Sequence, residues 1–201
     1  MGLSFLKVMR CFAWIAFGVV VTTAFSQGAG TTPNRRSKTA VDVKYDKSSD
    51  TTSVRLASMT VIQNLGGNEQ ELLELSVSFS YPKQVIATPK TVTIFVYSLY
   101  AGGAGFEDNR RLIVTLDGVQ TDLGNMDLVV DKSLSLRNDS IPWVQQNVRL
   151  SIQSTDFFRM AKAKQVKVVV GRKKFAFSEK QIQSLRDFAD LMQQEGQPFG
   201  P

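Results

Sequence analysis

The sequence predicts a mainly β protein, an antiparallel β-sandwich or open barrel with two helices near its C-terminal end. Apolar and polar residues alternate with a period of two through most of the chain, as in strands that have one face on a core. Turn residues separate these segments about every ten residues. Apolar residues at helical spacing occur only after residue 153. Together these observations favour stacked or closed antiparallel sheets over a helical or parallel fold.

The N-terminal segment 1–26 has the features of a secretory signal peptide. Lys7 and Arg10 form a basic head, an apolar run begins at Cys11, and Ala24 and Ser26 are the small residues of a cleavage site. The apolar run is shorter than the ~20 residues needed to cross a bilayer, so an uncleaved anchor is the weaker alternative. We therefore expect a periplasmic or secreted protein with no transmembrane span in the mature chain.

Three segments are expected after the signal peptide. Residues 27–40 contain no apolar side chain larger than alanine and are predicted to form a flexible leader. Residues 41–193 are predicted to form a single β-rich domain, which is large enough to bury its own core. Residues 194–201 combine two glycines with two prolines and are predicted to be a disordered tail.

The clearest expected strand spans 73–81, where large apolar residues alternate with glutamate and serine. This pattern predicts that Val77 and Phe79 face the core and that Ser76 and Ser78 face water. An aspartate in place of Val77 or Phe79 should therefore abolish folding, whereas Ser76 and Ser78 should tolerate one.

The other strands are predicted from composition and turn signals. Residues 91–100 are rich in β-branched and aromatic side chains on both faces, which favours a central place in a sheet. Asp117-Gly118 is typical of a two-residue hairpin turn and joins strands expected at 111–116 and 119–123. Further strands are expected at 41–45, 52–62, 126–130, 143–153, 165–170 and 173–177.

Two helices are expected late in the chain. A short helix near 155–163 is predicted to be capped by Ser154 or Thr155. A second, amphipathic helix near 179–193 follows a capping box in which Ser178 is the N-cap and Gln181 is the N3 residue. Both helices should pack against the sheets because each has one apolar face.

Two residue types are missing from the mature chain, and their absence excludes several mechanisms. The sequence has no histidine, and its single cysteine, Cys11, lies in the signal peptide. Catalysis by His-based or Cys-based nucleophiles, His-ligated zinc and disulfides are therefore excluded. Carboxylate-pair chemistry, Ser-Lys dyads and oxygen-ligated calcium are compatible with the composition.

The remaining chemical motifs are weak. Asp117, Asp122, Asp127 and Asp131 lack the dense spacing of a calcium loop and are expected in turns and loops. The glycine-rich segment 101–105 lacks the Lys-Ser/Thr of a phosphate loop. Asn138-Asp139-Ser140 is a glycosylation sequon that we interpret as a surface loop. We therefore assign no catalytic residue, no metal ligand and no cofactor.

The strongest charge feature is a basic stripe near the C-terminal end, with seven positive charges and no negative one. The stripe can bind anionic lipid headgroups, polyanionic surface polymers or nucleic acid, and the alternative is an ordinary solvated face. Nucleic acid is disfavoured because no stacking aromatic residues are interleaved with the cations and the chain is expected to be exported. The basic residues are Arg159, Lys162, Lys164, Lys167, Arg172, Lys173 and Lys174.

The order of elements from Asp156 to Met192 is a short helix, the VKVVVG strand, the KKFAF strand and a capped helix. This order resembles the closing segment of small, uncharacterised exported bacterial β-sandwich proteins. The resemblance covers about the last quarter of the chain and rests on hydrophobic pattern. It implies a fold and a compartment, and it transfers no functional residue.

The favoured function is that of a non-enzymatic β-sandwich domain that binds a macromolecule in the cell envelope or the secreted fraction. One alternative is a carboxylate-dependent hydrolase of cell-wall or surface polysaccharide, since such enzymes need only two acids across a cleft. Another alternative is a peripheral protein held at an anionic envelope surface or polysaccharide by the basic stripe.

Overall fold

The computed structural model describes residues 41–64, 69–82, 88–102, 105–106, 109–134 and 142–194. The expected mainly β fold is confirmed in this part of the chain, where two antiparallel sheets pack together and two helices follow residue 153. The regions that lie outside the described residues include the expected signal peptide 1–26, the leader 27–40, the Asn138-Asp139-Ser140 sequon and the tail from residue 195.

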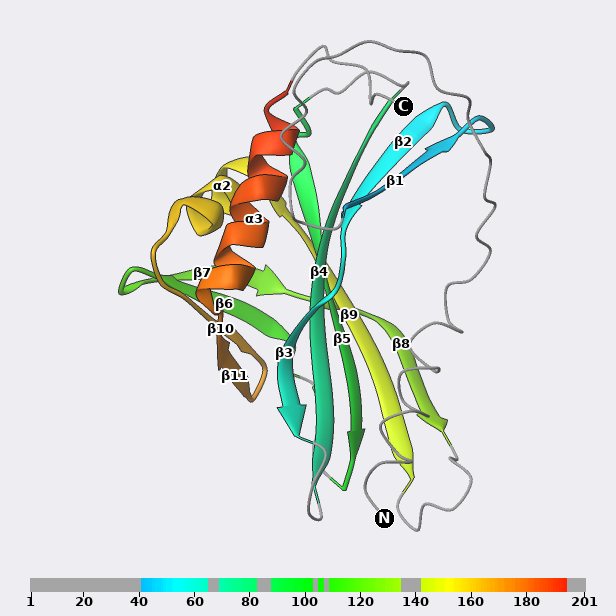
Figure 1. Cartoon of the computed structure of the whole chain (residues 1–201). Helices are drawn as coiled ribbons and strands as arrows, with labels where there is room; N and C mark the ends of the chain where they lie inside the picture. Colours follow the sequence, from blue (N-terminus) through cyan, green and yellow to red (C-terminus); the bar gives the residue numbers. More distant parts are fainter. Residues whose placement is uncertain are drawn as a thin grey trace. The chain divides into compact units, whose positions relative to one another are not determined.

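The larger sheet has seven strands in the order β1-β2-β4-β5-β9-β8, with β3 also paired to β4 (Figure 1). All of its pairings are antiparallel. Its strands are β1 (Val41–Asp46), β2 (Thr51–Leu56), β3 (Met59–Asn64), β4 (Gln70–Pro82), β5 (Thr91–Ala101), β8 (Asp127–Leu134) and β9 (Trp143–Gln153).

The smaller sheet has four strands in the order β11-β10-β6-β7, again all antiparallel. In Figure 1 it lies on the same side of the long strands of the larger sheet as the two helices. Its strands are β6 (Arg111–Leu116), β7 (Val119–Asn125), β10 (Val166–Val170) and β11 (Lys173–Ala176), and the helices are α2 (Ser154–Lys162) and α3 (Glu179–Met192).

The single strand expected at 52–62 is divided into β2 and β3. Both run along the same edge of the long strand β4, with Arg55 opposite Ser78 and Met59 opposite Leu75. Arg55 and Met59 are four positions apart along the β2–β3 segment, whereas their partners Ser78 and Leu75 are three positions apart along β4. The β2–β3 segment therefore has one extra residue at the break. A further register shift lies inside β3, between Thr60 and Ile62, and periodicity alone reveals neither irregularity.

The faces of the central strands follow the predicted alternation with one exception. Val77 and Phe79 are buried in the core, and β5 lies between β4 and β9 as expected. Ser76, on the opposite face, is also buried, with 3% of its surface exposed, so the expectation that it faces water is wrong. Its hydroxyl accepts a hydrogen bond from Nη2 of Arg55 at 3.1 Å, which replaces the lost contact with water.

The Asp117-Gly118 turn between β6 and β7 is confirmed. Asp117 has φ +49° and Gly118 has φ +92°. Positive φ at both central residues is the requirement of a type I′ turn, whose twist matches that of the two strands it joins. The aspartate tolerates this conformation and the glycine adopts it without steric cost.

The two helices begin differently. In α3 the predicted capping box is confirmed, because the amide of Gln181 donates to the Ser178 hydroxyl and the Gln181 side chain accepts from the amide of Ser178. In α2 the expected cap is wrong, because the N-cap is Gln153 and no side chain caps the helix. The hydroxyl of Ser154 instead donates to the carbonyl of Pro89, a contact between distant segments that local pattern cannot predict.

An aromatic cluster packs the helices onto the larger sheet. The ring of Phe188 in α3 lies 5.4 Å from that of Phe79 in β4 and 6.0 Å from that of Phe157 in α2, edge-on in both cases. Edge-to-face pairs at this distance stabilise a core beyond the area that they bury. All three residues belong to one hydrophobic cluster that also includes inward residues of the smaller sheet.

Polar contacts hold α3 in its orientation. The guanidinium of Arg186 donates to the carbonyls of Ala161 at 3.1 Å and Ala163 at 3.0 Å, at the end of α2. The last carbonyls of a helix have no partner within the helix, so the cation both satisfies them and complements the helix dipole. Gln181 donates from its side chain to the carbonyl of Thr60 in β3 at 2.7 Å.

Candidate functional site

The basic stripe is divided by the alternation of strand β11. Lys173 points to the inner side of the smaller sheet, where its Nζ lies 2.9 Å from Oε1 of Glu71 in β4. The two side chains are 15% and 17% exposed. The ammonium also lies 5.9 Å from the centre of the Tyr100 ring, within the range of a cation–π contact. Lys173 is therefore a structural residue that joins the two sheets.

The surroundings of Lys173 are polar and closely packed. Oε1 of Gln146 accepts a hydrogen bond from the amide of Phe106 at 2.8 Å. A Cβ at Gly105 would overlap the side-chain ends of Gln146 and Tyr100, so a larger residue there would require those side chains to move. These contacts fill the space beside Tyr100, where Gly105 and Phe106 pack against β5 and β9.

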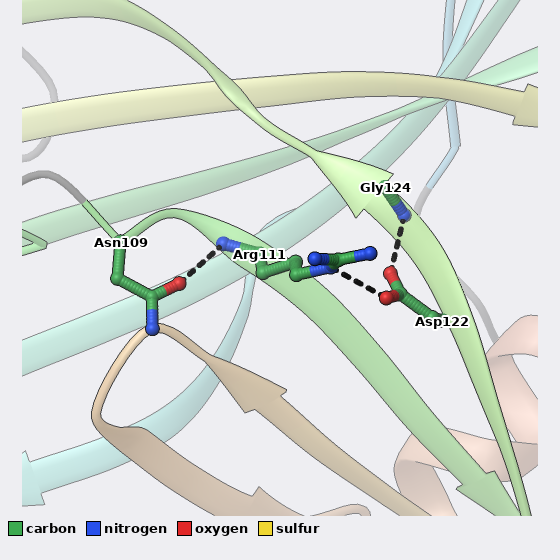
Figure 2. A network of polar contacts seen from close by, with 4 residues as sticks. All are labelled: Asn109, Arg111, Asp122 and Gly124. Carbon is green, nitrogen blue, oxygen red and sulfur yellow. Dashed lines mark hydrogen bonds and ion pairs between the residues drawn. The ribbon is translucent and has the colours of Figure 1, made fainter.

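Arg159 in the stripe and Arg111 beside it form exposed ion pairs. Arg159 lies 3.4 Å from Asp156 one turn earlier in α2. Arg111 in β6 contacts Asp122 in β7, and Figure 2 shows the two side chains directed toward each other across the strand pair. Exposed pairs of this kind contribute little stability, but each neutralises one positive charge locally.

The Arg111–Asp122 pair is part of a network that supports an irregularity of the strand pair (Figure 2). The register of β6 and β7 shifts between Leu112 and Ile113. At the shift, Oδ1 of Asp122 accepts from the amide of Gly124 at 2.9 Å, and Gly124 has φ +119°. Asp122 is thus a structural residue, and glycine is needed at position 124 because of its positive φ.

Four exposed lysines of the stripe form what we call the lysine surface: Lys162, Lys164, Lys167 and Lys174. No acidic side chain in the described ranges forms an ion pair with any of the four. Arg172, the remaining residue of the stripe, is exposed in the turn between β10 and β11.

Lys167 and Lys174 share the outward face of the smaller sheet. Lys167 is opposite Ala176, and Lys174 is opposite Val169, which places the two lysines on a diagonal across β10 and β11. Diagonal neighbours in an antiparallel pair are about 7–8 Å apart. Two like charges at this distance weaken the fold slightly, so their position favours a role in attracting negative charge over a role in stability.

The two half-buried glutamates of β4 do not form a pair of acids on one face. Glu71 and Glu74 lie on opposite faces of the strand, and Glu71 is already paired with Lys173. Burial raises the pKa of Glu74, and a hydrogen bond from Thr60 acts in the opposite direction. Among the described residues, no group of three or more His, Cys, Asp or Glu side chains is arranged to hold a metal ion.

Of the four aspartates expected in turns and loops, Asp117 lies in a turn, but the expectation is wrong for the other three: Asp122 lies in β7, and Asp127 and Asp131 lie in β8. Asp117 accepts from the amide of Lys164 at 2.9 Å, and Asp122 belongs to the network of Figure 2. Asp127 and Asp131 are exposed on β8, at the edge of the larger sheet. The glycine-rich segment 101–105 is described only in part, since residues 103–104 lie outside the described ranges.

The outer face of the larger sheet carries a second set of polar contacts that the sequence did not indicate. The guanidinium of Arg55 lies 5.6 Å from the centre of the Phe95 ring, in addition to its bond with Ser76. Burial and the nearby Glu74 carboxylate raise the pKa of Tyr97. These side chains lie on a partly buried face, where Ser76 is buried and Glu74, Phe95 and Tyr97 are half-buried.

Comparisons with known proteins give no relative. No protein-family model matches the chain, and neither a curated protein nor a solved structure matches it. Neither α2 nor α3, the helices of the described part, is long and apolar enough to cross a membrane.

Proposed function

We propose that the protein is an exported, non-enzymatic binding domain that engages a polyanionic partner of the cell envelope through the lysine surface. One observation carries the proposal. Lys162, Lys164, Lys167 and Lys174 are exposed without an acidic partner in the described residues, whereas Arg111, Arg159 and Lys173 close by are each paired. Unpaired positive charges on a surface attract anionic polymers and surfaces over distances of about 10 Å at 0.1 M ionic strength.

The alternative of a polysaccharide hydrolase has less support. Such an enzyme needs two carboxyl groups across one groove, about 5–10 Å apart. The two half-buried glutamates in the described ranges, Glu71 and Glu74, are separated by the sheet itself. Because Glu71 and Glu74 form no such pair, we favour binding without catalysis.

Retention on immobilised dextran sulfate tests the proposal. We expect wild-type protein to be retained at low salt and released steeply as salt rises, because exposed charges are screened. A variant with Lys162, Lys164, Lys167 and Lys174 changed to Glu should elute without delay and melt within a few degrees of the wild type. The matched control changes four exposed lysines elsewhere to Glu, namely Lys44, Lys47, Lys132 and Lys180.

The control has the same net charge as the test variant and should keep most of the retention. Equal loss in both variants would show that retention follows net charge alone, and the lysine surface would have no special role. Absence of retention of the wild type at low salt would refute the proposal.

Export is tested separately. Expression with the native N-terminal segment should yield a protein that begins at Gln27, because Ala24 and Ser26 provide the small residues of the cleavage site. N-terminal sequencing of the exported product measures this directly. An intact Met1 in a membrane fraction would contradict it.

A further inference from the structure

The tip of the β6–β7 hairpin presents an unusually exposed apolar side chain. Val119, the first residue after the Asp117-Gly118 turn, is 63% exposed and is the most exposed large hydrophobic residue of the described ranges. A single exposed valine is common on protein surfaces and has no meaning by itself. Val119 is of interest because the hairpin tip lies beside the lysine surface.

The hairpin tip is fixed beside the lysine surface. Oδ1 of Asp117 accepts from the amides of Lys164 at 2.9 Å and Gln165 at 2.8 Å, and the amide of Asp117 donates to the carbonyl of Gln165 at 3.1 Å. Figure 1 shows the turn between β6 and β7 projecting beside the segment that joins α2 to β10. Three hydrogen bonds and a type I′ turn hold Val119 in a defined position next to Lys164.

The local charge around Val119 is positive. Lys162 and Lys164 are exposed without an acidic partner in the described residues, and Asp117 is an acidic residue that contacts the backbone of Lys164. The Asp117 carboxylate is already engaged by two backbone amides. An apolar tip next to net positive charge therefore projects from this end of the smaller sheet.

This combination distinguishes between classes of polyanion. A hydrophilic polymer in water offers nothing to an exposed valine, so only the lysines would contribute to its binding. The surface of an anionic bilayer offers negative headgroups to the lysines and an apolar boundary to the valine. The presence of both features at one tip favours the bilayer.

We infer that the hairpin tip docks on an anionic phospholipid surface, with Val119 entering the interface and Lys162 and Lys164 contacting the headgroups. This inference rests on the proposed function, since it names the partner of the lysine surface. Binding of this kind is peripheral and reversible, because one apolar side chain and a few cations give far less affinity than a membrane-spanning helix.

Co-sedimentation with vesicles of phosphatidylcholine, with and without phosphatidylglycerol, tests the inference. We expect the wild type to bind only the anionic vesicles. Val119→Ser should weaken this binding about fivefold, because a valine side chain that is partly buried in the membrane interface is lost. It should leave retention on dextran sulfate unchanged. Val43→Ser removes another exposed valine, on β1, and should change neither measurement.

A fluorescent variant gives an independent measurement. Val119→Trp should bind anionic vesicles at least as tightly as the wild type, with a blue shift of its emission when the ring enters the interface. Trp143 is buried and provides a constant background. The emission of Val119→Trp should not shift with dextran sulfate.

The outcomes separate the two proposals. Retention on dextran sulfate without binding to anionic vesicles would overturn the bilayer inference and leave the proposed function standing. Vesicle binding that is equal for wild type and Val119→Ser, with no blue shift for Val119→Trp, would overturn the insertion of Val119. Failure to bind either polyanion would overturn both.

Discussion

Lys173 and Lys174 are neighbours in the chain and have opposite environments. Lys173 is mostly buried between the two sheets, where it pairs with Glu71 and lies against the ring of Tyr100. Lys174 is exposed on the outward face, and no acidic side chain in the described residues pairs with it. The difference follows from the pleat of strand β11, because successive side chains point to opposite faces.

The comparison shows that a count of charges does not define a binding surface. The sequence presents the seven cations of the basic stripe as equivalent, but the structure uses Lys173 for the fold and leaves Lys162, Lys164, Lys167 and Lys174 available. Inward positions should therefore affect stability when changed, whereas outward positions should affect binding. The predictions that follow test this division.

The largest effect is expected on strand β4. Val77→Asp places a carboxylate in the core without a partner, which should cost about 4–5 kcal/mol or more and prevent folding. Ser78→Asp changes the adjacent, half-buried residue on the other face and should leave a folded protein. Circular dichroism with thermal melts measures both. Equal damage from the two substitutions would show that the assignment of the faces is wrong.

A medium effect on stability is expected when Lys173, but not Lys174, is changed to Ala. Lys173→Ala leaves the mostly buried Glu71 without its partner and should lower the free energy of unfolding by about 1–3 kcal/mol. Lys174→Ala should change it by less than about 0.5 kcal/mol. Urea denaturation measures the difference. The double variant Glu71→Gln, Lys173→Ala should be less destabilised than the sum of the single variants, since no unpaired charge remains.

The smallest effect concerns Glu74, on the face of β4 opposite to Glu71. Burial raises the pKa of Glu74. The folded state therefore holds its proton to higher pH than the unfolded state, and stability falls as pH rises from the unfolded pKa through the folded one. Glu74→Gln should gain stability relative to the wild type, by less than about 1 kcal/mol, between pH 4 and pH 7. If the wild type instead became more stable relative to Glu74→Gln as the pH rises over this range, the predicted direction of the effect would be wrong.

Local sequence signals predicted the features that depend on neighbouring residues. The alternation of 73–81, the Asp117-Gly118 turn and the Ser178 capping box each depend on a few consecutive residues, and all three are found. These features are encoded by backbone conformation and by the pleat.

Contacts between distant segments could not be predicted in this way. The break between β2 and β3 and the register shift inside β3 depend on pairing with β4. The hydroxyl of Ser154 donates to the carbonyl of Pro89 instead of capping its own helix. The pairing of Lys173 with Glu71 joins residues that are far apart in the chain. Exposure of Val119 likewise depends on which segments pack near the hairpin, so the strand pattern around it carried no signal.

Backbone amide chemical shifts, followed by NMR while the mature protein is titrated with dextran sulfate at low salt, test the lysine surface most directly. We predict that the largest shifts occur at 162–167 and 174, that they disappear as salt rises, and that Lys173 and the outer face of the larger sheet around Arg55 change little. Shifts centred on Arg55 and Phe95, or no shifts at low salt, would contradict a binding function for the lysine surface.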